Sequence, residues 1–128
     1  MRYRFKSPPK IKASLAYFNL HGLAESPEWL GQRDPLDGQE GADYPVALSP
    51  EDLDLAGELN GLTTPKVVFT EACFGAHILR KEIHDSLALK FLASGTTALV
   101  GSTCMAYGSI NEQLTAADML GYSFWTNL

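Results

Sequence analysis

A histidine and a cysteine, each with a glycine close by, are the residues of this chain whose types suggest chemistry. His21 and Gly22 end the segment NLHG, and Cys73 stands in EACFG, two positions before Gly75. A free cysteine is only a few per cent thiolate at neutral pH, so it becomes an effective nucleophile when a neighbouring imidazole takes its proton. The same imidazole can later protonate a leaving amine. His21 and Cys73 therefore predict a nucleophile with its general base and acid.

The glycine beside the histidine suggests how the oxyanion formed in such a reaction would be stabilised. Because Gly22 lacks a Cβ, a substrate carbonyl can approach the main chain closely at this point. The backbone N–H groups of Gly22 and Cys73 are then the expected donors to the oxyanion that develops during attack.

Two apolar segments end at these residues and must position them. Residues 14–20 (SLAYFNL) and 66–71 (KVVFTE) predict buried strands, and residues 96–101 (TTALVG) predict a third. Strands that are apolar on both faces and separated by helices indicate a mainly parallel sheet in a three-layer α/β/α sandwich. The carboxyl ends of parallel strands lie along one edge, where ligands bind. If the first two strands are neighbours, about 4.8 Å apart, His21 and Cys73 emerge side by side.

The connecting segments predict helices and a loop. Residues 21–48, rich in Gly, Pro and Asp, predict a long surface loop. Residues 49–61 predict a short helix, whose signals are Ser49 as cap, Pro50 at the first position, Asp52 completing a capping box and Gly61 after the end.

Two further helices are expected towards the carboxyl terminus. Residues 83–94 predict a helix that Gly95 ends and whose apolar face is Ile83, Leu87, Ala88, Phe91 and Leu92. Residues 112–125 predict a last amphipathic helix, with Leu114, Ala117, Gly121 and Phe124 on one side.

Composition limits the classes of protein. With 128 residues, 45% of them hydrophobic, the chain forms one domain, or part of one. Five of the ten basic residues fall in a tail or linker at 1–13, and ten acidic residues lie from Glu25 to Glu58. An acidic middle disfavours nucleic acid as a partner. No apolar run is long enough for a membrane helix, and no signal peptide is recognised. We expect a soluble protein with thiols at Cys73 and Cys104; the compartment is left open, with the cytoplasm slightly favoured.

The chain resembles the cysteine peptidases of the caspase–hemoglobinase fold (clan CD), and most of all their gingipain-type family. The resemblance lies in LHG (20–22) and EACFGA (71–76), followed by DSLALKFLASGTTALVGST (85–103). His21 precedes Cys73 by 73 − 21 = 52 positions, the order and approximate spacing of caspases, and legumains likewise have Glu-Ala-Cys at their nucleophile. The resemblance covers roughly residues 14–125 and implies a cysteine-type endopeptidase without a cofactor. In it, His21 and Cys73 are the catalytic dyad, and Gly22 with the Cys73 backbone is the oxyanion hole.

The family's sheet has six strands, whereas three are predicted here and thirteen residues precede the first. Three explanations stay open. The chain is a fragment or subunit that docks on a partner chain, it completes its sheet with a second copy, or it is an inactive remnant that serves as an interaction module.

Substrate binding is expected at the ends of the second and third strands. Ser102, Thr103 and Tyr107 follow the third strand and are expected, with Cys104, to line the cleft. An acidic group at the base of the pocket would select Arg or Lys before the scissile bond, and Glu71, Asp118 and the acidic loop after His21 are the candidates. Relatives of the gingipain type prefer such basic residues.

Metal binding gives two other hypotheses. Cys73, His77, His84 and Cys104 are a possible zinc set for a structural or binding module, although their spacing is not that of compact zinc modules. Without a metal, His77 and His84 are expected at the surface. The acidic run Asp34, Asp37, Glu40 and Asp43 is a weak candidate for Ca²⁺, and solvated carboxylates are the better interpretation.

Overall fold

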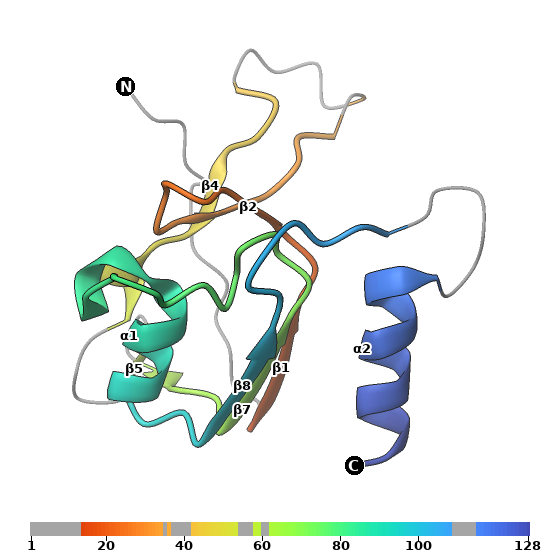
Figure 1. Ribbon diagram of the computed structural model, residues 1–128. Coiled ribbons are helices and arrows are strands. Elements are labelled where there is room, and N and C mark those ends of the chain that lie inside the picture. The colour runs from red at the N-terminus through yellow and green to blue at the C-terminus, as the bar shows by residue number, and fades with distance from the viewer. Residues whose placement is uncertain (1–13, 35, 37–41, 54–57, 60–61, 109–114) are drawn as a thin grey trace.

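The computed structural model of this 128-residue chain describes residues 14–34, 36, 42–53, 58–59, 62–108 and 115–128. The described residues mix helices and strands in an α/β arrangement (Figure 1). Three strands form a parallel sheet in the order β1-β7-β8, namely β1 (Leu15–Phe18), β7 (Val67–Thr70) and β8 (Ala98–Gly101). All three strands expected from the sequence are therefore present, each somewhat shorter than its apolar segment.

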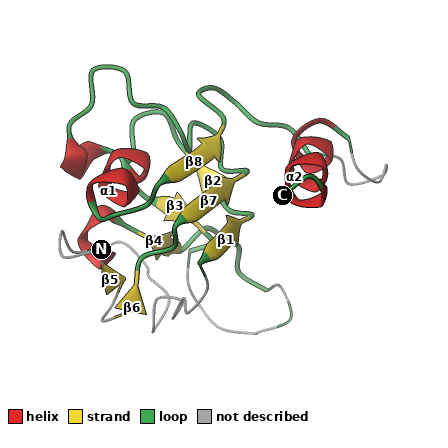
Figure 2. Ribbon diagram, turned by 90° about the horizontal axis from the view of Figure 1, so that it is seen from below, coloured by secondary structure: helices red, strands yellow, loops and turns green. Residues whose placement is uncertain are grey.

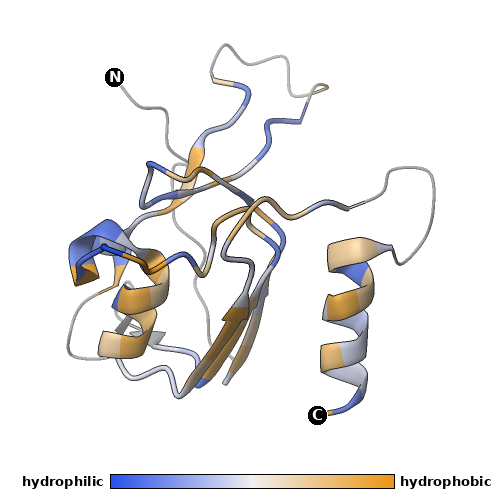
Figure 3. Cartoon of the chain, in the orientation of Figure 1, coloured by the Kyte–Doolittle hydropathy of each residue, from blue (hydrophilic) through white to orange (hydrophobic). Residues whose placement is uncertain are grey.

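The parallel sheet is formed mainly by apolar residues (Figure 3), and its strands pair in a regular register. Leu15 pairs with Val67, and Phe18 pairs with Thr70, so β1 and β7 end level with each other. Val68 and Phe69 of the central strand are almost fully buried. Seen from below, the three strands lie next to one another (Figure 2). The residues that follow β1 and β7 therefore start from the same edge.

Helix α1 (Leu87–Ala93) connects β7 to β8. It begins four residues later than expected, because Ile83–Asp85 form a 3₁₀ turn (η2) and Ser86 is extended. Ile83 and Leu92, predicted on its buried face, are 46% and 43% exposed, so that prediction was wrong. Gly95 ends the helix as expected, with a φ of +103° that other residues rarely adopt.

Helix α2 (Ala116–Thr126) follows the sheet and corresponds to the last expected helix. Its buried Gly121 and its Phe124 face the sheet, and the Phe124 ring lies 5.1 Å from that of Phe69. Leu114, predicted on the same face, lies outside the described residues.

The two helices contact different strands. Phe18 of β1 lies 5.8 Å from Phe91 of α1, whereas Phe69 of β7 contacts Phe124 and Trp125 of α2. Phe18 pairs with Thr70, and successive residues of a strand point to opposite faces, so Phe18 and Phe69 point to opposite faces of the sheet.

The expected long loop at 21–48 contains a small antiparallel sheet, which corrects that prediction. Its strands are β2 (His21–Gly22), β3 (Trp29–Leu30) and β4 (Val46–Leu48), in the order β2-β3-β4. Trp29 and Leu48 are buried in the core with Phe18 and Phe91. The segment is thus anchored to the main core by apolar side chains, which a surface loop would not be.

In the described residues of 49–61, the expected helix is present only as its first turn, and residues 54–57 and 60–61 lie outside the described residues. A 3₁₀ turn, η1 (Pro50–Asp52), starts with the expected capping interaction, in which the Ser49 N–H donates to Asp52 Oδ2 at 2.8 Å. The turn ends at Leu53, which is extended and buried. Burial of Leu53 in the core thus overrides the local helix signal. Glu58–Leu59 (β5) and Leu62–Thr63 (β6) pair antiparallel.

The expected tail or linker at 1–13 and Gly61 also lie outside the described residues. None of the described helices has the length and apolarity needed to cross a bilayer.

Candidate functional site

The sheet edge brings the main chains of the His-Gly and Cys segments into contact. A Cβ added at Gly22 would overlap the carbonyl oxygen of Cys73 and lie 3.3 Å from the Cβ of Ala72. Position 22 therefore requires glycine because the Cys73 peptide fills the space that a side chain would take. The approach of a substrate carbonyl to Gly22 stays a prediction.

The Cys73 thiol is half-buried and lies against the loop that follows β8. The Ala106 N–H donates to Cys73 Sγ at 3.3 Å, and Sγ lies equally far from the Ala106 carbonyl oxygen, to which the thiol donates. The main chain of Ala106 thus holds the sulfur both as donor and as acceptor. Cys73 and Cys104 are both free thiols, as expected.

The backbone at the candidate nucleophile is unusual. Phe74 has a φ of +57°, in the left-handed region, which costs a residue with a side chain about 1–2 kcal/mol. Its N–H donates to the Cys104 carbonyl, whereas no acceptor for the Cys73 N–H is found among the described residues.

His21 is exposed, and its ring contacts a different residue. The imidazole lies 4.9 Å from the ring of Tyr44, with an angle of 87° between the two planes. In the described part of the chain, no hydrogen bond joins His21 to Cys73 or to another side chain. The structure thus brings the two main chains together without joining imidazole and thiol.

A cavity of about 320 Å³ lies at the ends of β7 and β8, beside α2. Glu71, Ser102 and Tyr107, all expected to bind substrate, line it. The remaining lining is largely apolar and includes Phe69, Met105 and Leu120. Thr103 and Cys104 are exposed and are not part of this lining, so their place in the cleft stays a prediction.

Glu71 is the carboxyl group that lines this cavity. Its Oε1 is buried without a hydrogen-bond partner, and a Cβ added at Gly121 of α2 would lie 2.8 Å from it. Burial raises the pKa of Glu71 above its ordinary value. The hydrogen bond with Tyr17 opposes this rise in the pKa, whereas the hydrogen bond and the charge of Asp118 add to it. Burial and hydrogen bonding to Glu71 also raise the pKa of Tyr17. A cation entering the cavity would favour the ionised form of Glu71.

The candidate metal ligands do not converge. Among the described residues, no three His, Cys, Asp or Glu side chains form a group that could hold a metal ion. His84 is exposed and lies 3.8 Å from Glu82, while His77, also expected at the surface, is half-buried with its Nδ1 enclosed and unpartnered. Of the acidic run, Asp43 pairs with Arg33 at 3.0 Å, and Asp37 and Glu40 lie outside the described residues.

Comparison of the chain with protein-family models, with curated proteins and with solved structures finds no match. What the site does must therefore be argued from its own residues.

Three residues at the site were not predicted from the sequence. Ala106 acts through its main chain, which carries no residue-type signal. The alternation of β1 could have placed Tyr17 on the face of the sheet opposite to its neighbour Phe18. Tyr44 lies in a segment that was expected to be a loop.

Proposed function

We propose that this chain is a cysteine-type endopeptidase domain, with Cys73 as nucleophile and His21 as general base and acid. The observation that carries the proposal is the contact between Gly22 and the Cys73 peptide where β1 and β7 end level. This contact supports an arrangement in which the residues on either side of it, His21 and Cys73, work on one bound peptide.

The proposed reaction is acyl transfer in two stages. The Cys73 thiol gives its proton to His21, and the thiolate attacks the peptide carbonyl carbon while its oxygen becomes an oxyanion. The N–H groups of Cys73 and Gly22 donate to that oxyanion. The C–N bond then breaks, His21 returns the proton to the leaving amine, and a thioester remains on Cys73. Water activated by His21 adds to the thioester and releases the acid and the thiol.

The preferred substrate carries Arg or Lys before the scissile bond. Support comes from the cavity that Glu71, Ser102 and Tyr107 line, because its apolar walls suit an aliphatic stem and Glu71 Oε1 has no partner. A guanidinium or ammonium group would supply the missing donor and a counter-charge.

The proposal also covers the layer arrangement of the domain and the completion of its parallel sheet. Contacts of α1 and α2 with side chains on opposite faces of the sheet support a three-layer α/β/α sandwich of the caspase type. Since β1 is an outer strand of the described sheet, a partner chain or a second copy would complete the sheet at that edge.

A second candidate function is a catalytically inactive interaction module. The observation in its favour is that the thiol bonds to the main chain of Ala106 while the imidazole lies against Tyr44. The two candidates differ in whether His21 activates Cys73.

Covalent labelling tests the proposal. The purified chain is treated with a peptidyl acyloxymethyl ketone that carries Arg or Lys, and the adduct is located by mass spectrometry. We expect an adduct on Cys73 that is lost in Cys73→Ala and His21→Ala and kept in Cys104→Ala, whose exposed thiol is the matched control. Absence of an adduct on folded wild-type chain would favour the inactive module. Equal labelling by an otherwise identical probe with Asp would contradict the basic preference.

A further inference from the structure

Tyr44 and His21 meet beside the small antiparallel sheet. His21 pairs with Leu30 across β2 and β3, and Leu30 pairs with Val46 across β3 and β4, where a bulge shifts the register between Trp29 and Leu30. Tyr44 stands two positions before Val46, in the bend that leads into β4. The pairing of the three strands thus brings this bend near β2, and the Tyr44 ring contacts that of His21.

The Tyr44 ring is placed where it can restrain the imidazole. The two rings are nearly perpendicular, an arrangement that aromatic pairs prefer at such separations. In the described part of the chain, His21 has no other ring contact, ion pair or side-chain hydrogen bond. An exposed side chain on a two-residue strand would otherwise sample several rotamers.

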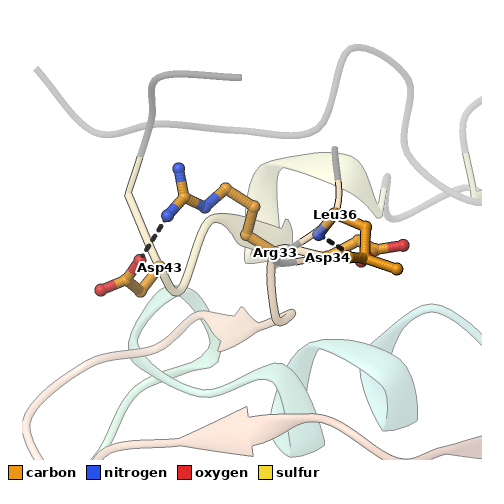
Figure 4. A network of polar contacts seen from close by, with 4 residues as sticks. All are labelled: Arg33, Asp34, Leu36 and Asp43. Carbon is orange, nitrogen blue, oxygen red and sulfur yellow. Dashed lines mark hydrogen bonds and ion pairs between the residues drawn. The ribbon is translucent and has the colours of Figure 1, made fainter. Parts of the chain in front are cut away.

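The backbone around Tyr44 is held on both sides. The Arg33 N–H donates to the Asp43 carbonyl at 2.9 Å, and the Gly31 N–H donates to the Pro45 carbonyl at 2.8 Å. The Arg33 guanidinium also pairs with the Asp43 carboxylate at 3.0 Å (Figure 4). These contacts extend the β3–β4 pairing past the strand ends, so Tyr44 has a fixed backbone from which to present its ring.

We propose that Tyr44 is a positioning residue that sets the plane of the His21 imidazole for proton exchange with Cys73. The inference rests on the proposed peptidase function and deepens it. The ring acts by contact, not through its hydroxyl, so phenylalanine can replace it. Removal of the ring lets His21 rotate away and slows the thiol's reaction without weakening substrate binding in the cavity at Glu71.

Nuclear magnetic resonance of the full chain tests the contact without any need for activity. The ring-proton signals of His21 are identified by their loss in His21→Gln. In Tyr44→Leu we expect them to shift, because the ring current of the tyrosine is gone, whereas Tyr44→Phe should leave them nearly in place. Tyr122→Leu is the matched control, since Tyr122 and Tyr44 are 55% and 54% exposed.

Labelling kinetics test the functional meaning. Loss of orientation is expected to lower the maximal labelling rate of Cys73 by about ten- to a hundredfold in Tyr44→Leu, with little change in the probe concentration for half-maximal rate. Tyr44→Phe should restore the rate, and Arg33→Met, which keeps the ring and loosens its backbone, should lie between. Unchanged His21 signals or an unchanged maximal rate in Tyr44→Leu would overturn the inference. A wild-type chain that takes no label would instead overturn the proposed function, so the two failures are distinguishable.

Discussion

The residues proposed to react with each other come from two sheets that are stabilised differently. Cys73 follows β7, the central strand of the parallel sheet, whose Val68 and Phe69 are almost fully buried. His21 belongs to β2, a two-residue strand at the edge of the antiparallel sheet, and is exposed. Burial fixes the position of the nucleophile, whereas the orientation of the base depends on surface contacts. Changes in the two regions should therefore have different consequences for stability and reactivity.

The two sheets share one aromatic cluster. The Phe18 ring lies 5.3 Å from Trp29 and 5.8 Å from Phe91, and Trp29 lies 5.8 Å from Phe91. These residues come from β1, β3 and α1, so the cluster holds the antiparallel sheet against the parallel one.

Truncation of this shared cluster should have the largest effect. Phe91 is fully buried, and Phe91→Ala is expected to lower the free energy of unfolding by about 3–5 kcal/mol, because it removes apolar contacts and leaves a cavity. Urea unfolding measures the change. Leu92→Ala is the control, because this neighbouring side chain is 43% exposed whereas Phe91 has no exposed surface. Similar losses for both variants would mean that Phe91 does not join the two sheets.

A methyl group at the junction of the sheets should have the next largest effect. Gly22→Ala places a Cβ on the Cys73 carbonyl oxygen, and such overpacking typically costs about 1–3 kcal/mol. Labelling of Cys73 should fall as well, since the two segments are forced apart. Gly95→Ala distinguishes loss of the contact from a general loss of stability, because Gly95 has a positive φ but no atom within 4 Å of the added Cβ. Gly95→Ala should lose stability and keep labelling of Cys73. Loss of labelling in Gly95→Ala, with labelling kept in Gly22→Ala, would refute the role of the contact.

Replacement of Glu71 should make stability less dependent on pH. Because the pKa of Glu71 is raised in the folded chain, the stability gained from its proton is complete below the ordinary value of 4.5 and is lost as pH rises through the raised pKa. Glu71→Gln lacks this loss, so its stability relative to wild type should increase from pH 4 to pH 8, while labelling by the Arg or Lys probe falls. Urea unfolding at both pH values measures the difference in stability between Glu71→Gln and wild type. A difference that is the same at both pH values would contradict burial as the cause of the raised pKa.

Loss of the ion pair beside Tyr44 should affect stability least. Arg33 and Asp43 are partly exposed, and such pairs contribute about 0.2–1 kcal/mol. A double-mutant cycle with Arg33→Met and Asp43→Asn measures the coupling by urea unfolding. A coupling well above this range would mean that the antiparallel sheet depends on the pair for its stability, and not only for the placement of Tyr44.

The parallel sheet was predictable from sequence, and the antiparallel one was not. The strands β1, β7 and β8 lie in apolar runs long enough to identify, and Gly95 marks the end of α1. In contrast, β2 and β3 have two residues each, too few for any periodicity, and they form through pairing with residues distant in sequence. At 49–53 the capping signal was correct, but the burial of Leu53 decided where the turn ends.

The candidate site divides in the same way. The spacing of His21 and Cys73 relative to their strands predicted that both would lie at one edge. The Ala106 main chain at the thiol and the Tyr44 ring at the imidazole could not be predicted, because both depend on how loops fold back onto that edge.

The pairing of β1 also bears on how the protein opens. Leu15 meets Val67 across 67 − 15 = 52 residues, whereas Ala98 meets the same residue across 98 − 67 = 31. Closing the longer loop costs about 0.5 kcal/mol more chain entropy, and β1 is an outer strand. Partial unfolding that detaches β1 should therefore leave β7, α1 and β8 together. Such an opening separates His21 from Cys73, so gentle heating should abolish the labelling of Cys73 while most of the helix content persists.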